Sequence, residues 1–423
     1  MISLAHLLLS LIVGSSILLM LIRPRNLPEA YWIGGGVLLL LLFRLVSWQL
    51  AAHAVVKALD VCLFLIGMML LSELAREHGV FDWLSSVVVR GAKGSCSILF
   101  ALVYAAGILV TMFMSNDATA VVLTPAILTA VRKAKVQPLP YLFVCALIAN
   151  AASFLLPISN PANLVVFHGQ MPPFRQWLLS FGVPCLISIA VTFLVMRWLF
   201  RNELRNTIEF EVEATPLRSD GKLVLMGLAV TVIVLLTASA LGMDLGLPTC
   251  LVALAITVAV SFKVRSNPLS LAREISWGTL GLVAGLFVMV DAMESVGAMQ
   301  RTQEWLVWAQ RLGPIAGTFI VGFVVGIANN LVNNLPLGLI AGSTLQAAHA
   351  RGLIANAVLI GVDLGPNLSV TGSLATILWL IALRRENLDV SFWSFLKVGA
   401  VAMPITLLAT LGGAVLMQIY FPH

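Results

Sequence analysis

The sequence predicts an all-α polytopic membrane protein built as an inverted repeat, each half holding five transmembrane helices and one re-entrant hairpin. Three observations lead to this prediction. The 423 residues are 60% hydrophobic and 10% charged, whereas a soluble domain carries about 25% charged residues. About ten apolar stretches are long enough to cross a ~30 Å hydrocarbon core. Two polar clusters, Ser115-Asn116-Asp117 and Asn329-Asn330 with Asn333-Asn334, interrupt apolar sequence about half a chain apart.

The apolar stretches define the elements in order. We expect crossings near residues 4–22, 30–48, 54–75, 141–167, 176–199, 222–241, 247–263, 275–296, 353–383 and 392–420. The pieces 96–131 and 313–348 contain the polar clusters, so each forms a re-entrant hairpin or a pair of full crossings. Residues 1–200 and 222–423 form the two repeats, and 201–221 form a cytoplasmic linker. Because five is odd, the second repeat is inverted relative to the first.

The distribution of Lys and Arg residues predicts the orientation of the chain in the membrane. With the N-terminus outside, only six of the 25 Lys and Arg residues lie on the outer side, namely Arg44, Lys57, Arg175, Arg301, Arg311 and Arg351. Cytoplasmic loops of membrane proteins carry an excess of Lys and Arg. We therefore expect both termini outside, and we attribute the net charge of +6 to cytoplasmic loops instead of to nucleic-acid binding.

Two late segments are predicted to be broken helices. Pro157 and Pro161 interrupt 141–167, and Pro366 with Gly365 and Gly372 interrupts 353–383. A proline removes a backbone donor and breaks the helical ladder. Non-helical backbone at membrane depth requires protein or water around it. The two hairpin tips and the two helix breaks therefore predict one site near the membrane midplane, as in secondary transporters with inverted repeats.

The candidate site residues come from these four segments. Those expected to bind cargo are Asn116, Asp117, Ser159, Asn160, Asn163, Asn333, Asn334, Gly372, Ser373 and Thr376. Those expected to line the same site are Ser115, Asn150, Asn329, Asn330 and Asn367. Asp117 and Asp363 are the candidate carriers of a proton or another coupling ion. The structural alternatives are interhelical hydrogen bonds for the amides and helix capping for the acids and hydroxyls.

Three motifs carry a family resemblance. NDATAVVLTP from Asn116, VNNLPLGLIAG from Val332 and DLGPNLSVTGSLATILWL from Asp363 resemble the arsenite/antimonite efflux permeases, the ArsB family of the ion transporter superfamily. The resemblance implies a scaffold subdomain and a moving transport subdomain that holds the hairpins and broken helices. It also implies proton-driven efflux of trivalent arsenic or antimony from a bacterial or archaeal cell through the inner membrane, optionally with a cytoplasmic ATPase subunit.

Two positions depart from the family pattern. Members often carry Asp at the position of Asn150 and Lys at that of Asn367. We expect these two residues to lie close together, so that an amide pair replaces a salt bridge and leaves Asp117 and Asp363 as the principal acids of the site.

The cargo that the family implies is mainly uncharged As(OH)3, which binds through hydroxyl hydrogen bonds or through thiolates. None of the five Cys lies in the four motif segments, and none has metal-ligand spacing. Amide and hydroxyl side chains supply both donors and acceptors. We therefore expect an oxygen and amide site with no metal and no cofactor.

Three alternatives stay open at this point. A sodium/proton antiporter of the same fold would use the same scaffold. A dicarboxylate carrier would need cationic side chains at the site, and the four motifs contain none. An integral-membrane enzyme would need a nucleophile–base or paired-acid constellation, and the sequence offers none.

Overall fold

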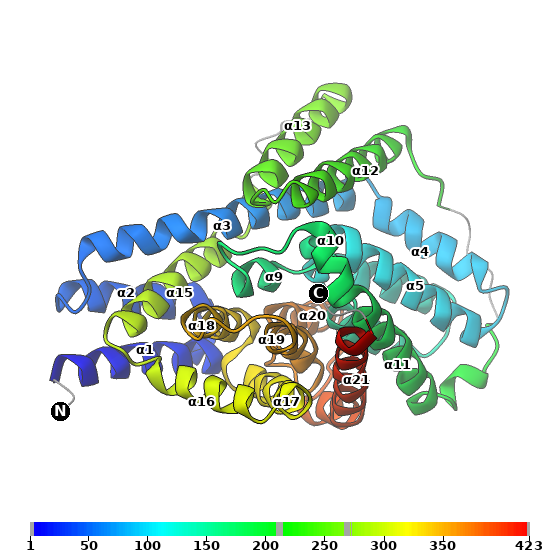
Figure 1. Cartoon of the computed structure of the whole chain (residues 1–423). Coiled ribbons are helices and arrows are strands. Elements are labelled where there is room, and N and C mark those ends of the chain that lie inside the picture. Colours follow the sequence, from blue (N-terminus) through cyan, green and yellow to red (C-terminus); the bar gives the residue numbers. More distant parts are fainter. Residues whose placement is uncertain (1–3, 209–214, 266–270, 272, 421–423) are drawn as a thin grey trace.

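The chain folds into helices that occur as two series of elements in the same order (Figure 1). The computed structural model describes residues 4–208, 215–265, 271 and 273–420. Within these residues every named element is a helix, and the sole β-type pairing is an isolated bridge between Ser95 and Thr207. The predicted all-α class is confirmed for the described residues.

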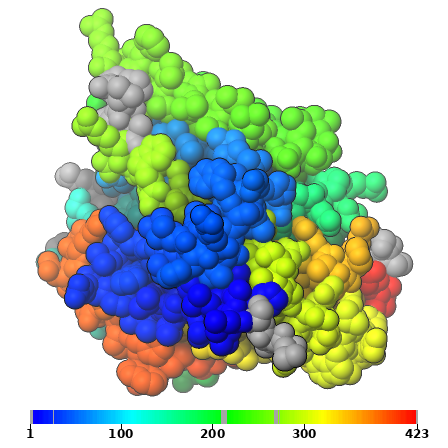
Figure 2. Space-filling view, turned by 90° about the vertical axis from the view of Figure 1, so that its left-hand side faces the viewer, coloured from blue at the N-terminus to red at the C-terminus, as the bar shows by residue number. Residues whose placement is uncertain are grey.

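Each series begins with two helices that precede its polar segments. In the first half these are α1 (Leu4–Ile22) and α2 (Glu29–Leu42), joined by the 3-10 turn η1 (Pro24–Asn26). In the second half they are α12 (Ser219–Ala240) and α13 (Gly246–Val264). Figure 2 shows the blue N-terminal helices across the middle of one face, with the green α12–α13 pair along the upper side, where α13 packs against α3 (Trp48–Glu77).

The remaining elements follow in a similar order, with more short pieces in the first series than in the second. The first series continues α3 (Trp48–Glu77), α4 (Val80–Gly91), α5 (Cys96–Met114), α6 (Asn116–Ala118), η2 (Thr119–Leu123), α7 (Thr124–Lys133), α8 (Leu139–Ala151), η3 (Pro157–Ser159), α9 (Pro161–Val166), α10 (Phe174–Trp177), η4 (Leu178–Gly182) and α11 (Val183–Leu199). The second continues α15 (Trp277–Ser295), α16 (Gln300–Arg311), α17 (Pro314–Val332), α18 (Asn334–Ala347), α19 (Leu353–Leu364), η6 (Gly365–Asn367), α20 (Leu374–Arg385) and α21 (Phe392–Tyr420).

Local sequence explains where several of these helices start and stop. Ser47 and Ser95 cap α3 and α5, because their hydroxyl oxygens accept hydrogen bonds from the backbone N–H groups of Leu50 and Ile98. Gly79 and Gly297 follow α3 and α15 with φ of 70° and 71°. Glycine adopts this left-handed conformation without a Cβ penalty. Each glycine turns the chain into a 12-residue helix, α4 or α16.

Most predicted crossings are long apolar helices. Nine described helices have the length and composition to cross a membrane. Seven of them match predicted crossings, and the other two are α5 and α17, the first arms of the interrupted pieces. The predicted crossings 30–48, 141–167 and 353–383 instead contain shorter apolar helices, because a turn with Arg44 at φ 54° ends α2 early and helix breaks divide the other two.

The predicted linker at 201–221 is largely irregular. It contains the short η5 (Glu203–Arg205), and the backbone N–H of Ile208 donates to the carbonyl of Gly94 at 2.8 Å. Residues 209–214 of this linker lie outside the described residues.

The two series meet through long helices, one from each half. α3 packs against α15, and α11 packs against α21. Both arms of the first interrupted piece contact α4, and both arms of the second contact α16. This arrangement places each break in the middle of the molecule, next to a broken helix.

Candidate functional site

The site is built around two helix breaks whose backbone is strained. Ser115, between α5 and α6, has φ 130° and ψ 163°, and Asn333, between α17 and α18, has φ 78° and ψ 153°. This region of φ and ψ is essentially restricted to glycine, and holding another residue there costs about 1–3 kcal/mol. Such strain clusters at ligand-binding positions. Because a strained residue occurs in each half of the chain, we take the first tip at Ser115 and the second tip at Asn333 as a candidate site.

The positions of the two strained residues change which residues of the two tips correspond to each other. The sequence pairs Asn116 with Asn333, which are 217 positions apart. The backbone instead matches Ser115 with Asn333 as the break, and Asn116 with Asn334 as the first helical residue after it. The pattern is therefore displaced by one residue from the sequence-based match.

Two equivalent amide oxygens are buried without a hydrogen-bond donor. Asn116 is 2% exposed and Asn334 is 4% exposed. The Oδ1 atom of each is buried and has no hydrogen-bond partner among the described residues. A buried polar atom without a partner costs about 1–3 kcal/mol, so an acceptor of this kind favours a ligand that brings a donor.

The broken helices present two capped N-termini. The side chain of Asn160 accepts from the backbone N–H of Ala162 at 3.0 Å, and that of Ser373 accepts from the N–H of Thr376 at 3.1 Å. Both caps have extended backbone, and η3 or the turn after η6 separates each from the preceding helix. The candidate residues Asn160, Ser373 and Thr376 are thus held at the starts of α9 and α20.

Asp363 connects the two halves of the chain. Its carboxylate accepts from Ser153 Oγ at 2.7 Å and from Asn160 Nδ2 at 2.8 Å, and the residue is fully buried. Both donors come from the first broken helix, whereas Asp363 lies near the end of α19. This carboxylate is therefore satisfied by protein.

Asn150 and Asn367 lie in contact, as the sequence predicts. Asn150 Nδ2 donates to Asn367 Oδ1 at 2.9 Å, and Asn367 Nδ2 donates to the carbonyl of Leu147 at 3.1 Å. The expected proximity is confirmed. The pair lies in the interior, with each residue 1% exposed.

Asp117 differs from Asp363 in both exposure and partners. It lies in α6, directly after the first tip, and is half-buried. Among the described residues, no hydrogen bond or ion pair reaches its carboxylate. Of the two acids, Asp117 is therefore the one whose protonation would leave the packing of the protein intact.

Several predicted site residues use their side chains to stabilise the breaks. Asn163 Nδ2 donates to the carbonyl of Ser153 at 2.9 Å and lies near two others in the same turn. Asn329 Nδ2 donates to the carbonyls of Gly361 at 3.0 Å and Val362 at 2.6 Å. These amide nitrogens donate to backbone carbonyls at the two helix breaks.

Asn330, Ser159 and Gly372 fix the shape of the same turns. Asn330 Nδ2 donates to Gly365 O at 3.0 Å, and Ser159 Oγ donates to Met112 O at 3.0 Å. A Cβ atom at Gly372 would lie 2.5 Å from Cα of Pro366, so the residue must be glycine to keep this close approach.

Each tip meets both halves of the chain. Within its own half, Asn333 Nδ2 donates to the carbonyl of Thr371 at 3.3 Å. Across the halves, α6 contacts α20 and α18 contacts α9. The structure thus brings together the four segments that the sequence singles out.

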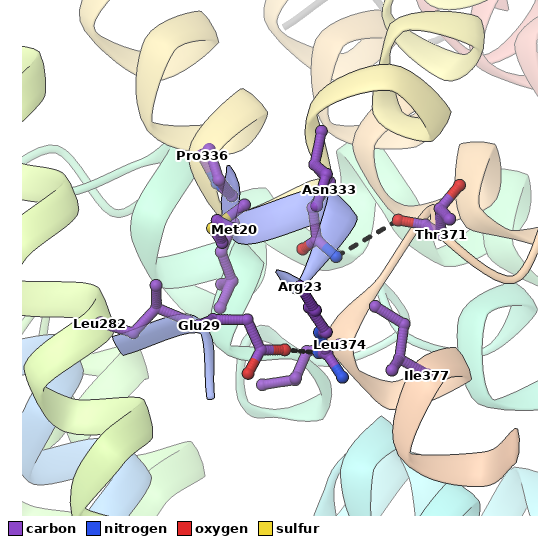
Figure 3. Close-up of a pocket in the computed structure, with 11 residues that line it drawn as sticks. Met20, Arg23, Glu29, Leu282, Asn333, Pro336, Thr371, Leu374 and Ile377 are labelled. Atoms are coloured by element: carbon purple, nitrogen blue, oxygen red, sulfur yellow. Dashed lines mark hydrogen bonds and ion pairs between the residues drawn. The ribbon is translucent and has the colours of Figure 1, made fainter. Parts of the chain in front are cut away.

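A cation that the motifs do not contain also lies at the second tip. Arg23, from the turn after α1, forms an ion pair with Glu29, the first residue of α2 (Figure 3). Both residues line a cavity of about 20 Å³ together with Asn333 and Thr371. The sequence does not predict this position for Arg23, because no local pattern indicates that its turn reaches the second half of the chain.

Among the described residues, no group of three or more His, Cys, Asp and Glu side chains is placed to hold a metal ion. Four of the five cysteines are buried and all five are unpaired. The geometry offers amide, hydroxyl and carboxylate groups at the site.

Comparison with protein families covers most of the chain. The family model described as "Citrate transporter" (CitMHS) matches residues 4–363. The chain belongs to this family. It is a multi-pass membrane transporter, and the match includes both tips, the first broken helix and the Asp363 carboxylate.

Curated relatives of this family member include arsenical pump membrane proteins. That of Escherichia coli is 27% identical over 365 residues, which cover 83% of this chain and 85% of the relative. A putative arsenical pump membrane protein of Bacillus subtilis is 24% identical over 92% of this chain and 94% of its own. The family resemblance of the three motifs is confirmed.

A solved structure shares the fold. The Alcanivorax borkumensis YdaH transporter superposes with a TM-score of 0.57 at 16% identity, covering 88% of this chain and 87% of that chain. The likeness concerns the arrangement of helices.

Proposed function

We propose that this transporter exports trivalent arsenic and antimony, as arsenite and antimonite, across the cytoplasmic membrane in exchange for protons. Relatives that carry the name arsenical pump membrane protein align over more than four fifths of this chain. Export of this kind would confer arsenic resistance.

The observation that carries the proposal is the pair of unsatisfied oxygens at the two tips. As(OH)3 is a small neutral solute with three hydroxyl groups that can donate hydrogen bonds. Asn116 Oδ1 and Asn334 Oδ1 are buried acceptors without a donor among the described residues. An anion would bring more acceptors to these oxygens and would leave them unsatisfied, so the tips favour a donor-bearing neutral cargo.

Each such hydrogen bond contributes only about 0.5–1.5 kcal/mol. Binding through a few of them is weak, which suits a carrier that must release its cargo. The other proposed contacts are Ser373, Thr376 and the N-terminus of α20, because α20 packs against α6.

Asp117 is the proposed proton carrier. Its carboxylate is half-buried beside Asn116 and has no partner among the described residues. Exchange of one neutral solute for one proton moves one charge, so 100 mV of membrane potential supplies about 2.3 kcal/mol. This corresponds to roughly fortyfold accumulation.

We further propose an elevator-type movement within an inverted repeat. Residues 1–200 and 222–423 would form the two repeats, and the breaks with α8, α9, α19 and α20 would form the moving part. The repeated order of elements and the packing of α3 on α15 and of α11 on α21 support a two-fold relationship. Both termini would then lie on the outer side of the inner membrane, which the distribution of Lys and Arg favours.

The deciding experiment measures arsenite uptake into everted membrane vesicles that contain this chain without an ATPase subunit. We expect respiration to drive uptake, a protonophore to abolish it, and sodium to have no effect. Uptake that required ATP and a second subunit would overturn proton exchange. Sodium-dependent collapse of the pH gradient without arsenite uptake would indicate the antiporter.

A citrate carrier is the second candidate, because the family model bears that name. Its specific support is Arg23, which brings a cation to the second tip. The same vesicles supplied with labelled citrate test this candidate directly.

A further inference from the structure

The cavity at the second tip has a balanced pair of charges. Its lining combines the Arg23 turn and the start of α2 with Asn333 and with Thr371 (Figure 3). Among the described residues that line it, Arg23 is the single cation and Glu29 the single acid. The two form an ion pair, and their side chains are 22% and 19% exposed.

The position of Glu29 makes this pair asymmetric. Glu29 is the first residue of α2, where the helix dipole and free N–H groups stabilise a negative charge. Arg23 is held by a left-handed backbone with φ 48° at the end of α1. The carboxylate is thus held by its own helix, whereas the guanidinium depends on Glu29 for its neutralisation.

Removal of the carboxylate would change what the cavity attracts. A guanidinium presents several donors in a planar fork and binds carboxylates and oxyanions strongly. Paired with Glu29, it has no net charge to offer an anion. A neutral hydroxylated solute does not need a net positive charge for binding, so the neutralised pair does not disfavour it.

We propose that Glu29 sets the charge selectivity of the second tip by neutralising Arg23, so that neutral hydroxylated solutes are accepted and carboxylates and oxyanions are rejected. This inference rests on the proposed function only for the identity of the neutral cargo. It assigns a specificity-determining role to a residue outside all four sequence motifs.

The test measures anion binding to the purified full chain by thermal stabilisation. Formate serves as the carboxylate, because it is small enough for this cavity, and it is titrated at constant ionic strength against chloride. The variants are Glu29→Gln, Arg23→Gln and the double variant. The matched control is Arg25→Gln, because Arg25 is exposed on the same turn and has no ion pair among the described residues.

We expect Glu29→Gln to bind formate at least about tenfold more tightly than the unmodified protein, because a charged hydrogen bond becomes available. The double variant and Arg25→Gln should not gain this affinity. Equal affinity of Glu29→Gln and the unmodified protein would overturn the inference, as would a gain that persists in the double variant. If Glu29→Gln does not fold, Glu29→Ser serves instead, because serine is compatible with the start of a helix.

The binding readout is independent of arsenite transport. If vesicles show no arsenite uptake while Glu29→Gln alone gains anion affinity, the proposed cargo is wrong and the charge selectivity stands. If arsenite is exported and no variant gains anion affinity, the proposed function stands and the role of Glu29 is wrong.

Discussion

Asn160 donates a hydrogen bond from Nδ2 to Oδ1 of Asp363 at 2.8 Å, and this bond joins the broken helix of the first half to that of the second. The same Asn160 caps α9 through its Oδ1. One side chain therefore both starts a half-helix and connects it to a buried carboxylate. We expect substitution of such connecting residues to lower stability, and substitution of residues that contact cargo to impair transport.

Asp363→Asn should destabilise the protein. The new amide would direct a donor toward Ser153 or Asn160, both of which already donate to this position. Loss of one such bond costs about 1–3 kcal/mol, which we expect as a lower thermal midpoint in detergent. An unchanged midpoint with lost proton coupling would instead make Asp363 a carrier.

Asp117→Asn should abolish proton-driven uptake while keeping the thermal midpoint. No protein partner of this carboxylate is lost among the described residues. Exchange of labelled for unlabelled arsenite across the vesicle membrane should continue, because exchange needs no net proton movement. Full retention of proton-driven uptake would exclude Asp117 as the carrier.

Asn116→Ala and Asn334→Ala should weaken arsenite transport with little effect on stability. Each change removes an oxygen that has no protein donor among the described residues. Loss of one hydrogen bond to cargo corresponds to about a two- to tenfold increase in KM. Asn329→Ala is the matched contrast, because it removes donors to Gly361 and Val362. It should lower the thermal midpoint, and similar midpoints for all three variants would contradict this division.

Asn150→Asp should be rescued by Asn367→Lys. The single change removes the donor to Asn367 Oδ1 and places a charge where the residue is 1% exposed. An uncompensated buried charge costs about 3–5 kcal/mol. The double variant restores a pair, so more than half of the lost stability should return. Additive losses in a double-mutant cycle of thermal midpoints would show that the two positions act independently.

Gly372→Ala should destabilise the turn before α20. The added Cβ would lie 2.5 Å from Pro366 Cα and 2.8 Å from Asn330 Oδ1. Overpacking of this kind costs about 1–3 kcal/mol. Gly412→Ala is the control, because nothing lies within 4 Å of a Cβ at that position of α21. Equal thermal midpoints of the two variants would mean that the turn can move to accommodate a side chain.

The sequence predicts much of this architecture because membrane helices are long and apolar, and because prolines and polar clusters mark their interruptions. It could not predict which atoms of an asparagine are satisfied. Asn329 and Asn334 each leave Oδ1 without a donor among the described residues, yet Asn329 also donates from Nδ2 to two carbonyls of the neighbouring break. That difference depends on packing between segments far apart in the chain.

The surroundings of Arg23 and of the two acids, Asp117 and Asp363, also depend on contacts between distant segments and could not be predicted from the sequence. A loop arginine carries no local signal that its turn will reach Asn333. Asp117 and Asp363 are equivalent candidates in sequence, and only tertiary contacts separate a half-buried carboxylate from one that two donors satisfy.

The shortness of α2 has an electrical consequence. Its 14 residues rise about 21 Å, whereas the hydrocarbon core is about 30 Å thick. The Glu29 end of this helix lines the cavity at the second tip, and a bilayer that α2 entered from its Leu42 end would extend beyond the turn that carries Arg23. The applied voltage would then fall over a thinner barrier than the whole bilayer. A charge that moves past this turn would cross the same voltage over a shorter distance and in a stronger field, while the work of about 2.3 kcal/mol per 100 mV would stay unchanged.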